Sequence, residues 1–491
     1  MTLHNPDPSL INEDIAPTSA AGRTWTVWNM AALWIGMVVC VPTYMIGGGL
    51  IDLGMSWWQA IVTVLIGNVI VLLPMMANGH AGTRYGIPFP VLARASFGIH
   101  GAHVPSVLRG LVACGWFGIQ TWIGGEAIYH LLGALAGGDL GGSDLPVLGI
   151  NGLELTCFLA FWALQVVVLW RGIESIKVLE SLAAPFLILM GFVLLGWAWW
   201  KANGLGPMLS TPSQFAPGGP KEGQFLGAFL PGLTAMVGFW ATLSLNIPDF
   251  TRYMRKQRDQ ILGQALGLPL FMTLFAFVGV AVTSATVVIF GEPIPDPTVL
   301  LGRLGGGAAV IASLVALTLA TLSTNLAANV VSAANTLVNL APKRIGFRLG
   351  ALITAGLGIA VFPWKLIESS EGFIFTWLIG YSALLGPIGG ILIVDYFALR
   401  RMELDLEGLY RLAGPYTYRG GFHPAAMIAL VVGVAPSLPG FLATVGWVGS
   451  VPPVFAMIYT YAWFVGFGLA AAVYWILAHR RVGGAHDRDA G

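Results

Sequence analysis

The chain has 491 residues, of which 56% are hydrophobic and only 10% are charged, and its mean hydropathy is +0.78. Ordinary globular proteins carry about 25% charged residues, so this composition excludes a soluble protein such as a secreted enzyme, a disordered regulator or a DNA-binding module. The formal charge of +1 gives no basic field to attract nucleic acid. The three cysteines, Cys40, Cys114 and Cys157, lie in apolar stretches, which argues against disulfides and against a thiolate metal site.

Apolar runs that could cross a lipid bilayer recur along the whole chain. One helical crossing takes roughly 20 apolar residues, and charged residues or turn clusters separate twelve such runs. The predicted spans are 28–50, 55–78, 104–136, 153–170, 176–200, 227–250, 261–290, 307–338, 346–363, 372–398, 424–446 and 454–478. Residues 1–27 are polar and show no signal-peptide pattern, so we expect the first span itself to direct membrane insertion.

Positive residues orient these spans, because lysine and arginine are retained on the cytoplasmic side. With the N-terminus inside, 20 of the 24 lie on inner connections. Among them, the basic cluster 252–258 is interpreted as an anchor for the cytoplasmic end of the sixth span. We therefore expect an even number of crossings, both termini in the cytoplasm and a multi-pass place in the plasma (inner) membrane. The four residues on outer connections are Lys201, Lys221, Arg303 and Lys365.

Two predicted spans are interrupted by proline and glycine. The first contains Cys40–Tyr44 followed by Gly47–Gly49, and the sixth contains Gly238–Trp240 and then Asn246–Asp249. Irregular backbone at membrane depth is tolerated where it lines a cavity or packs against protein. Interrupted helices at corresponding places of two five-helix units indicate an inverted-repeat secondary transporter. The alternative is that the prolines produce ordinary kinks.

These repeats organise the chain. We predict an all-α integral membrane protein with twelve transmembrane helices, in which two inverted five-helix repeats are followed by two further helices. A substrate site would then lie near the bilayer midplane, between the repeats. The predicted segments are a cytoplasmic tail 1–27, a first repeat 28–200, a second repeat 227–398, the two further helices 424–478 and a cytoplasmic tail 479–491.

Trp116 and Gln120 in the third span are four residues apart and so share one helix face. The tryptophan offers a broad π surface, and the amide offers both a donor and an acceptor. This pair suits a flat heterocycle with alternating carbonyl and N–H groups. Trp240, at the suspected break of the sixth span, could supply the second face. The alternatives are core packing for Trp116 and an interhelical hydrogen bond for Gln120.

The eighth span is unusually polar at its centre, where Ser323, Thr324, Asn325 and Asn329 lie. The two asparagines share one helix face. The two hydroxyls, joined by carbonyls freed at the break of the first span, could form the oxygen cage that a hard cation such as Na⁺ prefers. The alternative is that these small polar residues hold helices together.

Glu126 is the one carboxylate well inside a predicted span, and an acid at that depth is a candidate proton carrier. It follows Gln120 by six residues, about 240° around a helix. We therefore expect it to face away from Trp116 and to serve in a structural pair or an outer vestibule. The sequence has no phosphate loop, zinc-ligand spacing or nucleophile elbow, so we expect no enzymatic activity.

Short motifs follow one another along most of the chain. They are Arg23–Trp25, Val41–Tyr44, Asn78–Thr83, Pro88–Val91, Arg94–Gly98, Gly118–Thr121, Asn246–Arg252, Pro363–Lys365 and Asp395–Tyr396. This series resembles the nucleobase-cation-symport family, which includes carriers for uracil, cytosine, purines, allantoin and hydantoins. The resemblance implies the leucine-transporter-like fold with its five-plus-five inverted repeat.

The resemblance also implies a substrate site. In the family's sodium-hydantoin member, the ring stacks between tryptophans of the third and sixth spans, and amides of the third and eighth spans bond its edge. The matching residues here are Trp116, Trp240, Gln120 and Asn329, with a backbone contact from Phe239. One departure bears on the choice of ring, because Cys40 stands where that member has a glutamine.

A sodium site is implied in the same way. That member holds its ion with carbonyls of the first and eighth spans and with two adjacent hydroxyls. The corresponding residues are Gly36, Val39, Ala320, Ser323 and Thr324.

The sequence therefore predicts a monomeric secondary transporter in the lipid bilayer that imports a ring of the uracil, allantoin or hydantoin class by cation symport. We expect Na⁺ in preference to H⁺ as the coupling ion, and no other cofactor. The alternatives are a proton-coupled carrier of the same substrates and an amino-acid or amine transporter on the same fold. A membrane enzyme would need paired acids or a metal cluster at depth, and a transport-derived sensor would need a soluble output domain.

Overall fold

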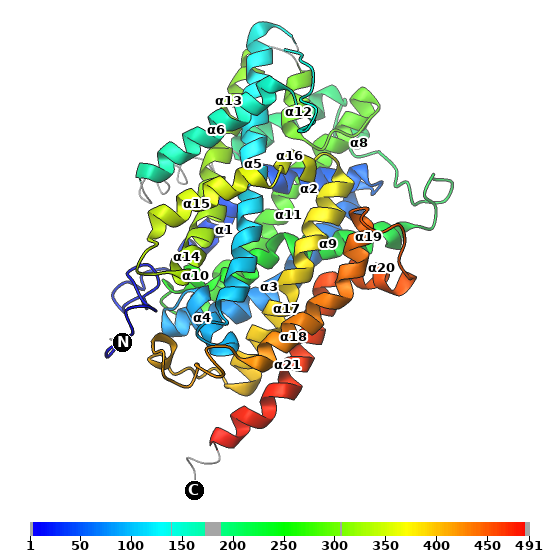
Figure 1. The fold of residues 1–491 in the computed structure, drawn as a ribbon. Coiled ribbons are helices and arrows are strands. Elements are labelled where there is room, and N and C mark those ends of the chain that lie inside the picture. The colour runs from blue at the N-terminus through cyan, green and yellow to red at the C-terminus, as the bar shows by residue number, and fades with distance from the viewer. Residues whose placement is uncertain (1–2, 139, 172–187, 305–306, 487–491) are drawn as a thin grey trace.

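The computed structural model of the protein describes residues 3–138, 140–171, 188–304 and 307–486, and these residues are helical throughout apart from loops and isolated bridges (Figure 1). The helices are α1 (Val27–Val38), α2 (Val41–Asp52), α3 (Trp57–Tyr85), α4 (Phe89–Phe97), α5 (His103–Ala136), α6 (Gly152–Arg171), a helix at Ile188–Lys201, α8 (Leu205–Met208), α9 (Phe225–Asn246), α10 (Pro248–Thr251), α11 (Gln257–Phe290), α12 (Pro297–Arg303), α13 (Ala308–Asn325), η1 (Leu326–Val330), α14 (Val331–Leu340), α15 (Phe347–Ala360), α16 (Pro363–Leu366), η2 (Gly372–Leu378), α17 (Ile379–Ile393), η3 (Val394–Leu399), η4 (Gly408–Tyr410), α18 (Pro424–Val434), η5 (Ala435–Ser437), α19 (Leu438–Thr444), α20 (Pro453–Thr460) and α21 (Ala462–His486).

The described helices accommodate the predicted membrane spans. Eight helical segments are long and apolar enough to cross a membrane, and the bent pair α1–α2 makes a ninth. Two shorter apolar helices, Ile188–Lys201 and Phe347–Ala360, lie in the predicted fifth and ninth spans. The remaining span is α5, whose 34 residues extend about 50 Å. The first part of the fifth span, 176–187, lies outside the described residues.

The predicted interruption of the first span is confirmed. The axes of α1 and α2 are bent by 58°, and Cys40 between them is extended, with φ −146° and ψ 160°. Pro42 cannot continue the hydrogen-bond ladder of α1, because proline has no amide hydrogen.

The sixth span is not broken at Gly238–Trp240, contrary to the expectation from the sequence. α9 continues without interruption to Asn246, and the chain turns only there. Because Pro248 has no amide hydrogen to bond the Ser244 carbonyl, that carbonyl accepts a 2.6 Å hydrogen bond from Asn78 Nδ2 on α3 instead.

Glycines at both predicted interruptions permit close helix packing. Gly47 lies inside α2, where a Cβ would come within 2.5 Å of the Ala276 carbonyl oxygen of α11. Gly238 lies inside α9, where a Cβ would lie 2.8 Å from the Leu378 carbonyl oxygen. Real Cβ atoms do not approach backbone this closely, so these glycines are explained by helix contacts and not by a break.

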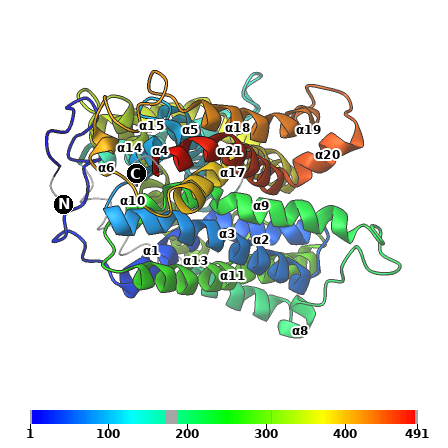
Figure 2. The same ribbon diagram turned by 90° about the horizontal axis from the view of Figure 1, so that it is seen from below.

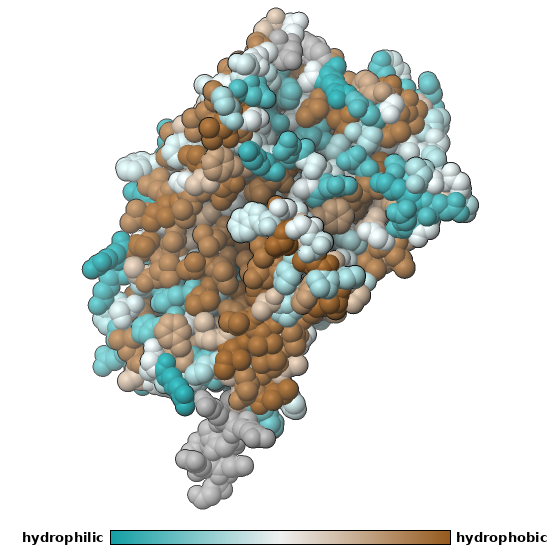
Figure 3. Space-filling model, turned by 45° about the vertical axis from the view of Figure 1, so that its right-hand side comes forward, coloured by the Kyte–Doolittle hydropathy of each residue, from teal (hydrophilic) through white to brown (hydrophobic). Residues whose placement is uncertain are grey.

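The membrane helices form two packed groups (Figures 1 and 2). In one group, α1, α2 and α3 pack against α11, and α3 also packs against α9. In the other, α5 packs against α6, α13 and α15, and α14 packs against α15. The last helices pack on α17, with α18 and α21 in contact. The face shown in Figure 3 carries a broad apolar area, as a lipid-facing surface requires.

The two termini lie at the same end of the bundle, here called the terminus side (Figure 1). The N-terminal segment packs across this end. Arg252 donates to the carbonyls of Asp14 and Ala16 and to Thr18 Oγ1. Tyr410 donates its hydroxyl to the Ile15 carbonyl. Arg252, expected only to anchor the sixth span, therefore also fixes the N-terminal segment.

Cysteine labelling tests which side of the membrane this end faces. Cys40, Cys114 and Cys157 are buried, so an introduced cysteine can be read without background. In intact cells, a membrane-impermeant thiol reagent should modify Glu222→Cys but should modify Ala20→Cys only after permeabilisation; both positions are exposed. Labelling of Ala20→Cys in intact cells would invert the proposed topology.

Candidate substrate and cation site

Aromatic side chains from the two helix groups meet inside the bundle. The ring centroid of Trp116 on α5 lies 5.2 Å from that of Phe239 on α9, with the ring planes at 65°. Phe239 lies 5.0 Å from Trp240. The two predicted tryptophans therefore belong to one aromatic cluster. Phe239, for which only a backbone contact was expected, joins them through its ring.

Four further aromatic residues of this cluster were not predicted. Phe373, Trp377 and Tyr381 of η2 and α17 lie 6.0, 5.9 and 6.4 Å from Trp116. Trp34 of α1 lies 5.2 Å from Trp240. The spacing of the first three, four residues apart in the tenth span, places them on one helix face, and this pattern could have revealed them.

Buried polar atoms accompany the aromatic cluster. In the part of the chain that the structure describes, Gln120 Oε1, Trp240 Nε1 and Trp377 Nε1 are buried and have no hydrogen-bond partner. Such burial costs free energy unless a partner is supplied. Unpaired donors and acceptors beside aromatic surfaces are suited to a planar ring that carries both N–H and C=O groups.

The predicted amide Asn329 lies in η1, a π-helical turn that the sequence did not reveal. π-helical turns occur often at functional sites. Asn329 Nδ2 donates a 2.8 Å hydrogen bond to Asn325 Oδ1, and Asn325 itself bonds to α5 and α6. The two asparagines on one face therefore have different partners.

The break between α1 and α2 frees two of the predicted cation ligands. In a continuous helix the Gly36 carbonyl would bond the Cys40 amide, but that amide bonds Val38 instead. The Val39 carbonyl would bond the Thr43 amide, which bonds Cys40. A Cβ at Gly36 would meet no atom within 4 Å, so open space adjoins the break.

The other predicted cation ligands lie on α13. Ala320, Ser323 and Thr324 are buried, and Ser323 Oγ has no hydrogen-bond partner among the described residues. Hydroxyl and carbonyl oxygens are the ligands that hard cations prefer. The residues present therefore fit a small hard cation in the chemistry of their donor atoms.

Cys40 is placed at the start of α2. Its Sγ lies 3.3 Å from Thr43 Oγ1, and Thr43 Oγ1 in turn lies 3.4 Å from the Met272 sulfur of α11. The hydrogen-bond partner recorded for Cys40 is therefore Thr43 of the same helix.

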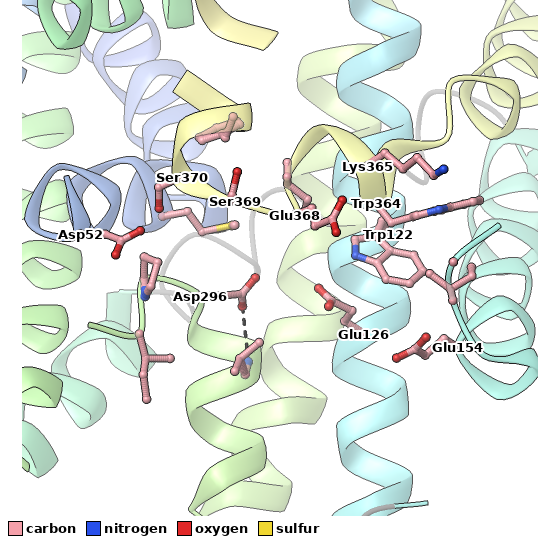
Figure 4. A pocket seen from close by; sticks show the side chains of 18 of the residues that line it. Asp52, Trp122, Glu126, Glu154, Asp296, Trp364, Lys365, Glu368, Ser369 and Ser370 are labelled. Carbon is pink, nitrogen blue, oxygen red and sulfur yellow. Dashed lines mark hydrogen bonds between the residues drawn. The ribbon is translucent and has the colours of Figure 1, made fainter. Parts of the chain in front are cut away.

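A cavity of about 780 Å³ opens beside α12 and α16, at the end of the bundle opposite to the terminus side (Figures 1 and 4). Its lining is rich in carboxylates, among them Asp52, Glu126, Glu154 and Asp296. Phe373 also lines this cavity, and its ring contacts Trp116. Phe373 therefore stands between the cavity and the aromatic cluster.

Glu126 lies in this cavity and not beside Trp116. Figure 4 shows it near Trp122, with Glu154 and Asp296 on either side. Its Oε2 atom is buried and has no hydrogen-bond partner among the described residues. This placement agrees with the helical spacing from Gln120, which directs Glu126 away from the Trp116 face.

Comparison with known proteins reveals relatives along almost the whole chain. Residues 17–466 match the family model described as permease for cytosine/purines, uracil, thiamine, allantoin. The purine-uracil permease of Arabidopsis thaliana is 51% identical over 476 residues, which cover 96% of this chain and 78% of that one. The allantoin permease of Bacillus subtilis is 41% identical over 474 residues, covering 95% and 93%. A nucleobase-cation-symport-1 family transporter, solved in a closed conformation with bromovinylhydantoin bound, is 28% identical with a TM-score of 0.77 and covers 97% of both chains.

Proposed function

Since the chain belongs to the family of permeases for cytosine, purines, uracil, thiamine and allantoin, we propose that it imports a planar heterocycle of the uracil, allantoin or hydantoin class by cation symport. As a member of this family it is a multi-pass membrane transporter and not an enzyme. The observation that carries this proposal is the buried aromatic cluster between the two helix groups, with unpaired polar atoms on Gln120 and Trp240. We further propose that the protein acts as a monomer in the plasma membrane.

Each residue of the cluster has a proposed role. Trp116 and Trp240 provide aromatic faces for the ring, with Phe239 between them, and Gln120 and Asn329 bond its edge. Aromatic faces and amide edges recognise different parts of a heterocycle, so together they fix both its plane and its rotation within that plane. Cys40 contributes thiol surface at the first-span break, where it would influence ring size.

Transport requires that the cluster open alternately to the two sides of the membrane. The cavity opposite to the terminus side supplies one access route, and Phe373 separates it from Trp116. Rocking of the α1, α2, α3, α9 and α11 group against the α5, α6, α13 and α15 group would expose the ring to one side and then the other.

Sodium is the proposed coupling ion. The freed carbonyls of Gly36 and Val39 and the buried hydroxyls of Ser323 and Thr324 offer oxygen ligands, with the Ala320 carbonyl as the fifth. The unpaired Glu126 oxygen in the cavity favours the second candidate, a proton-coupled carrier of the same substrates.

Tryptophan fluorescence of the purified protein tests the substrate class. Titration with uracil, allantoin and hydantoin should produce saturable quenching by at least one of them, because Trp116 and Trp240 would contact the ring. Absence of saturable binding for all three would contradict the proposal.

Replacing Thr324 with alanine tests the sodium site. Because the ion and the substrate stabilise the same conformation, each raises the affinity for the other by one common factor. Thr324→Ala should bind substrate weakly and gain nothing from added Na⁺, while its sodium-free affinity stays near that of the wild type. Thr318→Ala on the same helix, whose hydroxyl bonds the Leu314 carbonyl, should retain the sodium effect. Equal responses to Na⁺ in both variants would remove Thr324 from the site.

A further inference from the structure

A closed hydrogen-bond network lies behind Asn329, between α5, α6 and α13. Thr121, Gln165 and Asn325 are fully buried. Asn325 Nδ2 donates to Gln165 Oε1 at 2.8 Å, to the Phe117 carbonyl at 3.0 Å and, more weakly, to Thr121 Oγ1 at 3.2 Å. Gln165 Nε2 donates to Thr121 Oγ1 at 2.9 Å, and Thr121 donates its own hydrogen to the Phe117 carbonyl at 2.6 Å.

The Phe117 carbonyl fixes the direction of this network, because a backbone carbonyl can only accept. Thr121 must therefore give its hydrogen to that carbonyl, and its lone pairs then face the amide groups of Gln165 and Asn325. For the same reason, the Asn325 atom next to Phe117 must be the nitrogen. The oxygen of Asn325 consequently points to Asn329, and the orientation of each amide follows from its partners.

This direction determines what Asn329 offers to the aromatic cluster. Its nitrogen donates one of its two hydrogens to Asn325 Oδ1 at 2.8 Å. This bond holds the nitrogen on the Asn325 side of the amide, so that the oxygen lies on the other side, where it can accept from a ligand. Gln120 also has a buried oxygen without a partner among the described residues. Both amides of the candidate site can therefore offer an acceptor to a ligand.

We infer that Thr121 and Gln165 are positioning residues that act through Asn325 to hold Asn329 as a hydrogen-bond acceptor, so that the site selects rings with an N–H donor at the edge that faces Asn329. This inference rests on the proposed function, because it takes Asn329 as a substrate contact. Neither positioning residue touches the ring. Gln165 is an amide in the middle of the fourth span.

Uracil and cytosine provide the probes. Position 3 of the ring is an N–H donor in uracil and an acceptor in cytosine, and position 4 changes from a carbonyl to an amine, while the two rings have nearly the same size and shape. An acceptor placed against the Asn329 oxygen leaves two buried acceptors unpaired, so the wild type should bind uracil roughly 5- to 150-fold more tightly than cytosine. For a five-membered ring, hydantoin and its two N-methyl derivatives form the equivalent set.

The experiment measures this preference in purified variants whose folding is checked by size-exclusion chromatography. Asn325→Leu removes the partner of the Asn329 nitrogen, so that the Asn329 amide can rotate by half a turn and present either its oxygen or its nitrogen. The ratio of the uracil affinity to the cytosine affinity should then approach one. The double variant Thr121→Val/Gln165→Leu leaves Asn325 with only the Phe117 carbonyl, and the preference should be intermediate. Thr121→Ser keeps the hydroxyl and should keep the wild-type preference. Asn68→Leu is the matched control, because Asn68 is a buried asparagine whose amide bonds the Val64 carbonyl of its own helix, α3.

The outcomes separate this inference from the proposed function. Uracil-selective binding that is lost in Asn325→Leu or in the double variant, but kept in Asn68→Leu, supports the inference. An unchanged preference in both network variants, or a wild-type preference for cytosine, overturns the inference and leaves heterocycle transport intact. If no uracil, cytosine, allantoin or hydantoin binds to the wild type, the proposed function fails, and the inference fails with it.

Discussion

Asp395→Asn is expected to lower the unfolding free energy by about 3–5 kcal/mol, because it removes one partner of a buried ion pair and leaves the other charge uncompensated. Asp395 is fully buried. Its carboxylate accepts from Arg400 Nε at 2.8 Å, from Ser96 Oγ at 2.9 Å and from the Tyr474 hydroxyl at 2.7 Å. These partners lie on α4, on α21 and directly after η3, so the charge joins three elements at the terminus side.

This effect is measured by thermal unfolding in detergent, in which size-exclusion chromatography of heated samples gives the fraction that remains folded. Glu292→Gln is the control, because the ion pair of Glu292 with Arg303 is exposed and such pairs contribute about 0–1 kcal/mol. Adding Arg400→Met to Asp395→Asn removes the orphaned charge and should restore part of the stability. A melting temperature of Asp395→Asn equal to that of Glu292→Gln would show that the buried pair does not stabilise the fold.

Trp116→Ala is expected to weaken substrate binding roughly 5- to 150-fold, since stacking of a base on an aromatic side chain contributes about 1–3 kcal/mol by alanine substitution. Trp116 is buried and contacts four aromatic rings, those of Phe239, Phe373, Trp377 and Tyr381. Loss of the indole therefore removes a ligand face and opens a cavity in the cluster.

Isothermal titration with uracil, allantoin or hydantoin, whichever the wild type binds, measures this loss. Gln120→Leu should also weaken binding, because it removes an acceptor while preserving side-chain volume. Trp58→Ala is the matched control, because Trp58 is an exposed tryptophan on α3. Wild-type affinity in both Trp116→Ala and Gln120→Leu would remove this face of the third span from the site.

Much of the fold could be predicted because lipid imposes simple rules on sequence. Apolar runs and the asymmetry of basic residues indicated the spans, and Pro42 marked the break of the first one. In the sixth span the helix ends at Asn246, within the predicted interruption Asn246–Asp249, but the break expected at Gly238–Trp240 is absent, because glycine has two uses. Gly238 accommodates the Leu378 backbone, and this requirement depends on a partner helix more than a hundred residues away.

The residues of the aromatic cluster could be named from the sequence, but their contacts with one another could not. Trp116, Gln120 and Trp240 are conspicuous as polar or aromatic groups within spans. The ring contact of Phe239 with both tryptophans, the π-helical turn at Asn329 and the direction of the Asn325 amide depend on packing between distant helices. Pairwise geometry of this kind is not encoded in the residue pattern of any single helix.

Uptake into proteoliposomes tests cation-coupled heterocycle transport most directly. Radiolabelled uracil, allantoin and hydantoin are offered while a Na⁺ gradient and a pH gradient are imposed separately. An inward Na⁺ gradient alone should drive accumulation of at least one of the three compounds, and a pH gradient alone should not. Accumulation that is independent of Na⁺, follows the pH gradient and disappears with a protonophore would contradict the sodium assignment in favour of Glu126. No accumulation of any of the three compounds under either gradient would contradict the transport proposal itself.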